Sequence, residues 1–151
     1  MPANRALSTT RGALAYGDRR ERVVVKGAGA LAAVGSLGIA AFQVALAAGA
    51  PFGRAAWGGS HERLPRKLRV TSAVASAVWV LAALVVLADA GFDVSPIPAS
   101  VADWATWVLA ALLLLGAVMN FLSRSRPERI IWGPIALVLA GLTAFVASAS
   151  S

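Results

Sequence analysis

The chain has 151 residues, of which 58% are hydrophobic and 14% are charged, and its mean hydropathy is +0.72. Soluble domains are about 45–50% apolar and about 25% charged, so this composition argues against a soluble globule. The chain contains no cysteine and one histidine, His61, which excludes disulfides, thiolate sites and multi-histidine metal sites. We therefore expect no cofactor and no bound metal.

The formal net charge of +7 is spread unevenly along the chain. Six of the fourteen bases lie in the first 26 residues, five within residues 54–69 and three within residues 124–129. Three acids, Asp89, Asp93 and Asp103, lie in or beside one connector that carries no base. This segregation is typical of membrane surfaces, whereas a nucleic-acid groove needs its bases on one face. We expect a lipid bilayer as partner and no nucleic acid.

Residues 1–23 are polar, carry both signs of charge and show little sustained periodicity. Because their apolar side chains form no continuous stripe, we interpret residues 19–22 as part of a solvated basic tail, in preference to a short interfacial helix. We treat this tail as distinct from a membrane domain at residues 24–151. The apolar run that follows is longer than the core of a secretory signal, so we expect no such signal.

Four uncharged apolar runs follow, at residues 28–49, 70–88, 104–122 and 130–148. The first could extend about 33 Å as a helix, enough for a hydrocarbon core of about 30 Å, and the other three are near the short end of the spanning range. Their continuous apolarity differs from barrel strands, and in lipid the backbone must satisfy its own hydrogen bonds. We therefore predict an all-α, polytopic membrane protein built as a four-transmembrane-helix bundle.

The three connectors differ in character. Residues 51–69 are long, basic and rich in helix breakers, and residues 89–103 are acidic and contain Pro96 and Pro98. Residues 123–129 are short, so we predict that the third and fourth spans form an antiparallel hairpin.

Small residues recur at four-residue spacing in the first two spans, where they allow helix backbones to approach closely. In lipid, close packing and polar contacts hold helices together, because apolar burial contributes little. We expect a seam inside one bundle, with a homo-oligomer interface as the alternative. The sets are Ala28, Ala32, Ser36 and Ala40; Ala41, Ala45 and Gly49; Ser72 and Ser76; and Ala73 and Ala77.

Three of the five tryptophans lie at or near the start of a predicted span, and a fourth, Trp57, lies in the first connector. Trp57, Trp104, Trp107 and Trp132 are interpreted as interface anchors, because amphipathic indoles prefer the headgroup region. Trp79 lies in mid-span and is expected to pack within the bundle or contact lipid. An aromatic cage around a ligand is the less favoured interpretation.

The first connector holds the most specific candidate site. Its paired glycines permit a sharp turn that can offer amide N–H groups to an anion beside basic side chains. The alternative is a structured loop whose bases only set membrane topology. We predict a site for lipid phosphate or another anionic headgroup at Gly58, Gly59, His61, Arg63, Arg66, Lys67 and Arg69.

Candidate polar contacts within the membrane are Gln43, Asn120 and Ser72. A single deep amide such as Gln43 more often bonds between helices than to a substrate, and Asn120 can bond across to another helix. No ionisable residue lies deep in a predicted span, which argues against a proton-driven carrier but leaves a passive pore or a uniporter. Glu128 pairs with Arg124 only if this stretch is helical, which Pro127 disfavours.

An even number of spans places both termini on one side of the membrane. Six bases then lie on the tail side and eight on the side of the first and third connectors. Because short connectors near the membrane carry most weight, we favour termini outside, with connectors 51–69 and 123–129 in the cytoplasm.

Short motifs at the span ends carry a family resemblance. The chain resembles uncharacterised small four-span integral membrane proteins of actinobacterial type, and its Ala, Val and Arg bias is typical of a high-GC bacterium. This resemblance covers residues 28–148 and implies a bacterial inner membrane and the fold, with no known activity. The motifs are GAPFG from Gly49, WGG from Trp57 with His61, LP from Leu64, LR from Leu68, Asn120, SRS from Ser123, ER from Glu128 and Pro134.

The favoured function is a non-enzymatic helical bundle that binds lipid, a small solute or another membrane protein. One alternative is a small oligomeric transporter or channel lined by Gln43, Asn120 and Ser72. A second is a membrane-interface enzyme that uses His61 on a lipid headgroup. His61 has only Ser60 and Glu62 beside it, and adjacency in sequence does not make a triad, so we assign no catalytic residue.

Overall fold

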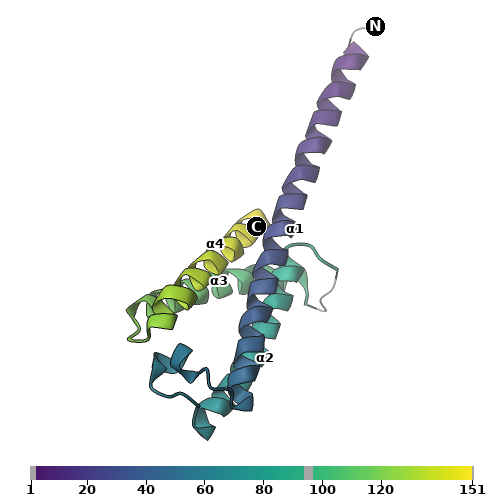
Figure 1. The fold of residues 1–151 in the computed structure, drawn as a ribbon. Helices are drawn as coiled ribbons and strands as arrows, with labels where there is room; N and C mark the ends of the chain where they lie inside the picture. Colours follow the sequence, from purple (N-terminus) through teal and green to yellow (C-terminus); the bar gives the residue numbers. More distant parts are fainter. Residues whose placement is uncertain (1–2, 94–96, 151) are drawn as a thin grey trace.

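The computed structural model describes residues 3–93 and 97–150, with side chains from residue 17 onward. This part of the chain contains helices and no strand, which confirms the predicted all-α four-helix bundle (Figure 1). The long helices are α1 (Ala3–Ala48), α2 (Arg66–Asp89), α3 (Ala99–Leu122) and α4 (Gly133–Ser150). The first connector contains the 3-10 turns η1 (Gly53–Ala55) and η2 (Trp57–Gly59), and the π-helical turn η3 (Glu128–Trp132) precedes α4.

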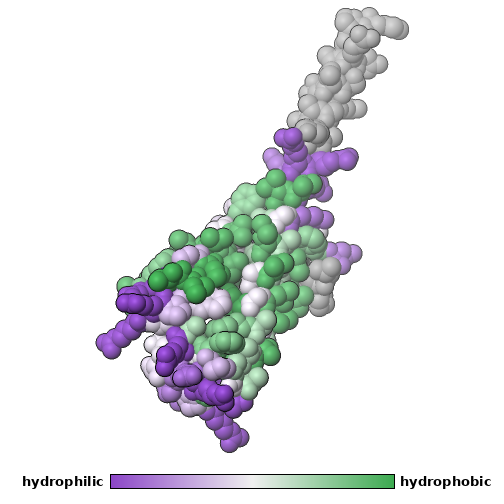
Figure 2. Space-filling model, viewed as in Figure 1, coloured by the Kyte–Doolittle hydropathy of each residue, from purple (hydrophilic) through white to green (hydrophobic). Residues whose placement is uncertain are grey.

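Four helical segments are long and apolar enough to cross a membrane: residues 17–48, 66–89, 99–122 and 128–150. They include the four predicted spans, apart from residue 49, and extend each of them at one or both ends. Large apolar side chains such as Leu31, Val78, Leu112 and Val138 point outward, each more than half exposed. Figure 2 shows a largely apolar flank with polar groups gathered at its ends. Such a flank is unfavourable in water and matches lipid, so the chain is a multi-pass membrane protein.

α1 begins much earlier than the predicted first span and projects beyond the bundle (Figure 1). Residues 19–22 are helical, unlike the tail we favoured, although every side chain from residue 17 to 24 is exposed. The helix continues because no proline interrupts residues 3–48, and Asp18 forms an i,i+4 ion pair with Arg22 at 3.1 Å.

α1 ends where Gly49 adopts a positive φ of 91°, a conformation that an L side chain rarely takes. The Ala50 N–H then donates to Ala45 O at 3.0 Å, the closing bond of a Schellman motif. The Arg69 side chain, from the next helix, donates through Nε to Ala47 O at 2.8 Å. Arg69 therefore caps the end of α1 and ties the start of α2 to it.

α1 packs mainly on α2 and α3 on α4, which confirms the predicted hairpin of the last two spans. Ala28, Ala32, Ser36 and Ala40 are each at most 8% exposed, so this face of the first span forms an internal seam as predicted. On the second predicted face Ala41 is exposed, whereas Ala45 and Gly49 are half-buried, so this face is less enclosed than the first. On α2, Ser72 is buried, whereas Ala73 and Ala77 are exposed. The homo-oligomer interface stays a prediction.

The first and third connectors meet at one end of the bundle. Ser125 Oγ, between α3 and η3, donates to Arg54 O in η1 at 2.8 Å. At the other end, Ser150 Oγ donates to Asp89 O at 2.9 Å, joining the C-terminal ends of α4 and α2. The bundle therefore has a connector end, formed by residues 49–65 and 123–128, and a tail end, where α1 projects.

Candidate functional site

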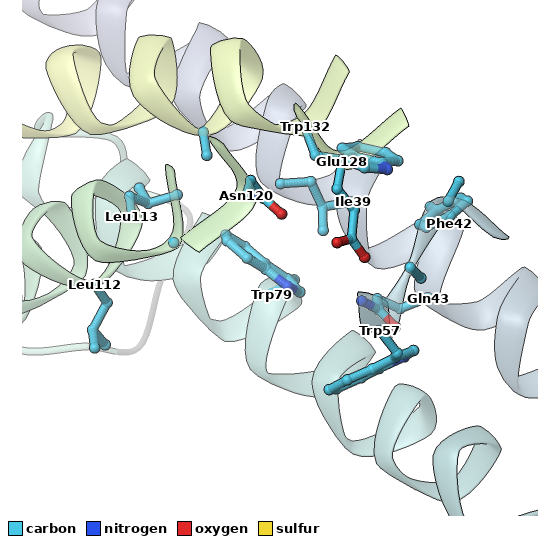
Figure 3. A pocket seen from close by; sticks show the side chains of 14 residues that line it. Ile39, Phe42, Gln43, Trp57, Trp79, Leu112, Leu113, Asn120, Glu128 and Trp132 are labelled. Carbon is cyan, nitrogen blue, oxygen red and sulfur yellow. The ribbon is translucent and has the colours of Figure 1, made fainter. Parts of the chain in front are cut away.

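A cavity of about 220 Å³ lies at the connector end of the bundle. Helices α1, α2, α3 and α4, the turn η3 and the first connector all contribute to its wall (Figure 3). Three polar side chains reach it from α1, α3 and η3: Gln43, Asn120 and Glu128. The rest of the wall is apolar and includes four aromatic side chains, Phe42, Trp57, Trp79 and Trp132. A second hollow, of about 370 Å³ between α3 and α4, is lined by Trp107 and small or aliphatic residues.

Glu128 is the ionisable residue of this cavity and is only 7% exposed. Its Oε1 atom accepts a hydrogen bond from the Gly58 N–H at 2.9 Å, and its Oε2 atom accepts one from the Ser123 hydroxyl. Figure 3 shows the carboxylate pointing into the cavity, on the side of Gln43 and Trp57. Two neutral donors thus hold the carboxylate in place.

A proline sets the local conformation that follows Glu128. Pro134 has no N–H, and in a regular α-helix its ring would clash with the carbonyl of Ile130. The chain forms the wider π turn η3 immediately before it, in which the Gly133 N–H bonds to Glu128 O. Gly133 also lets α3 and α4 approach, because a Cβ there would lie 2.8 Å from the Phe121 ring.

The first connector folds back sharply at Trp57, Gly58 and Gly59, which have positive φ values of 54°, 80° and 72°. A positive φ is unfavourable for tryptophan, and the Trp57 indole N–H is fixed by a bond of 3.1 Å to the buried Ser72 hydroxyl. A Cβ at Gly59 would lie 3.0 Å from Arg54 O, so glycine permits the close approach here. The predicted sharp turn at the glycine pair is confirmed.

The prediction that the amide N–H groups of this turn bind an external anion is wrong. The Gly58 N–H is bonded to Glu128, and the Gly59 N–H donates to Ala56 O at 3.0 Å. An anion does bind the turn, but it is a carboxylate from the chain itself.

The side chains predicted to complete the headgroup site stay outside the cavity. His61, Arg63, Arg66 and Lys67 are exposed, and none of them lines the cavity wall. Arg69 is exposed as well and caps α1. A contact between these bases and lipid headgroups stays a prediction.

The three predicted intramembrane polar residues separate into two groups. Gln43 and Asn120 line the same cavity, whereas Ser72 is buried behind Trp57. Gln43 Oε1 is buried and has no hydrogen-bond partner among the described residues, so the interhelical bond expected for this atom is not formed. Trp79 was expected to pack within the bundle or contact lipid, and Trp132 was expected to anchor the chain at the interface. Both form part of the cavity wall.

Sequence reasoning missed Glu128 as a site residue. The helix ends at Leu122, so Glu128 is not set one turn from Arg124, and it bonds to Gly58 instead. An acidic residue just after a proline at the start of an apolar run is a usual sign of a helix start and does not indicate a partner 70 residues away.

The fold and the cavity define a four-span helical membrane protein with a mostly apolar pocket at one end, into which three polar side chains reach. Within the described ranges, no group of three or more His, Cys, Asp or Glu side chains is placed to hold a metal ion. Comparisons with protein-family models, curated protein sequences and solved structures find no match. The geometry of the cavity therefore carries the functional proposal.

Proposed function

We propose that this chain is a non-enzymatic protein of a bacterial inner membrane that binds a small amphipathic solute in the connector-end cavity. Ligand sites are typically concave and mostly apolar, with a few convergent polar groups. The observation that carries the proposal is the convergence of Gln43, Asn120 and Glu128, from three different elements, on one aromatic-walled cavity.

The position of the cavity suits an amphipathic ligand. Glu128 is the first residue of its spanning segment, so the cavity's polar side lies near the membrane surface. Leu113, nine residues before the end of α3, supplies apolar wall closer to the membrane interior. A ligand with one polar end and an apolar body would match both parts of the wall.

Transport is the second candidate function. Gln43 and Asn120 line one cavity, as the pore-type alternative requires, although Ser72 does not join them. A lipid-headgroup enzyme has less support, because exposed His61 does not contribute to the cavity wall.

We further propose that the connector end faces the cytoplasm. Residues 54–69 and 124–129, at the connector end and in the adjoining helix starts, carry eight bases and two acids, whereas the remainder of the chain carries six bases and five acids. Bases in short loops close to the membrane favour the cytoplasmic side, where they also attract anionic headgroups.

Filling the cavity tests the proposed function. A Cβ added at Gly116, on the cavity wall, meets no atom within 4 Å, so Gly116→Phe is expected to fill the space without displacing the backbone. The probe is 4-bromobenzyl alcohol, a neutral amphipath whose bromine quenches tryptophan fluorescence, added to the protein in lipid nanodiscs. We expect saturable quenching, superimposed on the linear part due to lipid partitioning, because three tryptophans line the cavity.

The matched control is Gly38→Phe, on α1. Gly38 is helical and exposed, has open space around its Cβ position and does not line the cavity. Saturable quenching should disappear in Gly116→Phe and persist in Gly38→Phe. Strictly linear quenching in the unmodified protein, or saturable quenching that survives in Gly116→Phe, contradicts the proposal.

A further inference from the structure

The Glu128 carboxylate lacks a cationic partner. Among the residues that the structure describes, the ion pairs are Arg22 with Asp18 and Arg54 with Glu62, and neither includes Glu128. Its two hydrogen-bond donors, the Gly58 N–H and the Ser123 hydroxyl, are neutral. A carboxylate shielded from water without a counter-charge is unfavourable, so a cation in the cavity would stabilise it.

A second hydrogen-bond acceptor, Gln43 Oε1, belongs to a residue of the same cavity wall. Gln43 Oε1 is buried and unpartnered, and its side chain lies on the cavity wall with the Glu128 carboxylate (Figure 3). The Trp57 N–H is already bonded to Ser72 and is not available to either acceptor. Two acceptors on one wall match a ligand that brings N–H donors or a positive charge.

The aromatic side chains favour an organic cation over a bare metal ion. Phe42, Trp57, Trp79 and Trp132 surround the polar groups (Figure 3), and the rings of Phe42 and Trp132 lie 4.7 Å apart at 42°. The negative faces of such rings attract ammonium groups, and tryptophan does so best. Metal ions such as Mg²⁺ or Ca²⁺ require several oxygen ligands in place of aromatic carbon.

We infer that the cavity binds the ammonium group of an amphipathic organic amine or quaternary ammonium compound. Glu128 supplies the counter-charge, and the aromatic rings enclose the alkyl surface of the cation. Gln43, whose Oε1 atom has no partner among the described residues, accepts from the cation after its amide group rotates toward the cavity. The apolar body of the ligand lies against Leu113. This inference rests on the proposed function and names the ligand class of the same site.

The test compares a cation with a neutral molecule of the same shape. The probes are 4-bromobenzyltrimethylammonium and 1-bromo-4-neopentylbenzene, in which carbon replaces the nitrogen, and the readout is saturable tryptophan quenching in phosphatidylglycerol nanodiscs. We expect half-saturation by the cation at a concentration at least about tenfold lower in the unmodified protein than in Glu128→Gln. The neutral isostere should bind both proteins equally, because it does not interact with the charge.

The variants separate the charge from the fold. Glu128→Gln keeps an oxygen for the Gly58 N–H and places an amide beside the Ser123 hydroxyl, so the local structure should be retained. Glu62→Gln removes an exposed charge from the same connector end and should leave cation binding within about twofold, because exposed pairs contribute little. Binding of 4-bromobenzyl alcohol checks that the cavity of Glu128→Gln is intact. This variant should still show saturable quenching by the alcohol, and adding Gly116→Phe to it should abolish that quenching.

The ammonium group can belong to a free amine or to a lipid headgroup. Replacing half of the lipid by phosphatidylethanolamine is compared with replacing it by an uncharged diacyl glycolipid, because both replacements lower the anionic surface charge equally. Phosphatidylethanolamine should weaken binding of the cationic probe to the unmodified protein more than the glycolipid does if the headgroup is the occupant, and equally if a free amine is. Equal affinity of the cation for the unmodified protein and Glu128→Gln overturns the inference, even if the neutral alcohol binds. The proposed function fails only if the alcohol also shows no Gly116-dependent saturation.

Discussion

The hydrogen bond from the Gly58 N–H to Glu128 connects two residues 70 positions apart and fixes the polar side of the cavity. The sequence alone predicted the donor side of this bond, because paired glycines indicate a turn with exposed amides. It did not predict Glu128 as the acceptor, since a glutamate in an arginine-rich connector is expected to face water. Only the folded structure brings the third connector into contact with the first.

A glycine in the same connector provides a stability prediction. A Cβ at Gly53 would lie 2.6 Å from His61 O, a backbone atom that cannot easily move. Gly53→Ala should lower the free energy of unfolding by about 1–3 kcal/mol, because overpacking forces the backbone to shift. Reversible unfolding in mixed detergent micelles, followed by circular dichroism, measures the change.

The control has the opposite expected sign. Gly38 lies in α1 with open space around its Cβ position, so Gly38→Ala should be neutral or stabilise by up to about 1 kcal/mol through helix propensity. Equal effects of the two substitutions would show that the connector is not packed as described.

At the scale of elements, the small residues of α1 were interpretable from sequence because their four-residue spacing matches one helix face. Ala32 and Ser36, on that face, are at most 2% exposed. Which of the two small-residue faces of α1 would be the more buried could not be predicted, since both consist of small residues at the same spacing. The turn η3 was not predicted either, although Pro134 is the residue that requires it.

Enlarging a seam residue tests the packing of α1. Ala32 is 1% exposed, so Ala32→Leu should lower the free energy of unfolding by about 1–3 kcal/mol. Ala41→Leu, on an exposed face of the same helix, should change it by less than about 0.5 kcal/mol. Chemical crosslinking of both variants in membranes adds a check, because loss of a crosslinked dimer in Ala41→Leu alone would support the homo-oligomer alternative.

At the scale of the whole molecule, the sequence predicted the number of spans and the fold class, because continuous apolar runs in lipid can only be helices. It also predicted that the first and third connectors share one end, since four spans alternate in direction. The cavity was not predictable, because its wall combines residues from every helix and depends on how far the helices separate at that end. The helical state of residues 19–22 was missed because exposed helices need no apolar stripe.

The most direct measurement is single-cysteine labelling in intact cells, for which the chain offers a background without native cysteine. Suitable exposed sites are Ser60 in the first connector, Arg126 in the third and Ser100 at the start of α3. With a membrane-impermeant maleimide, Ser100→Cys should label from outside, whereas Ser60→Cys and Arg126→Cys should label only after the membrane is opened. Labelling of Ser60→Cys and Arg126→Cys from opposite sides, or of all three from one side, would contradict the four-span bundle with its cavity between paired connectors.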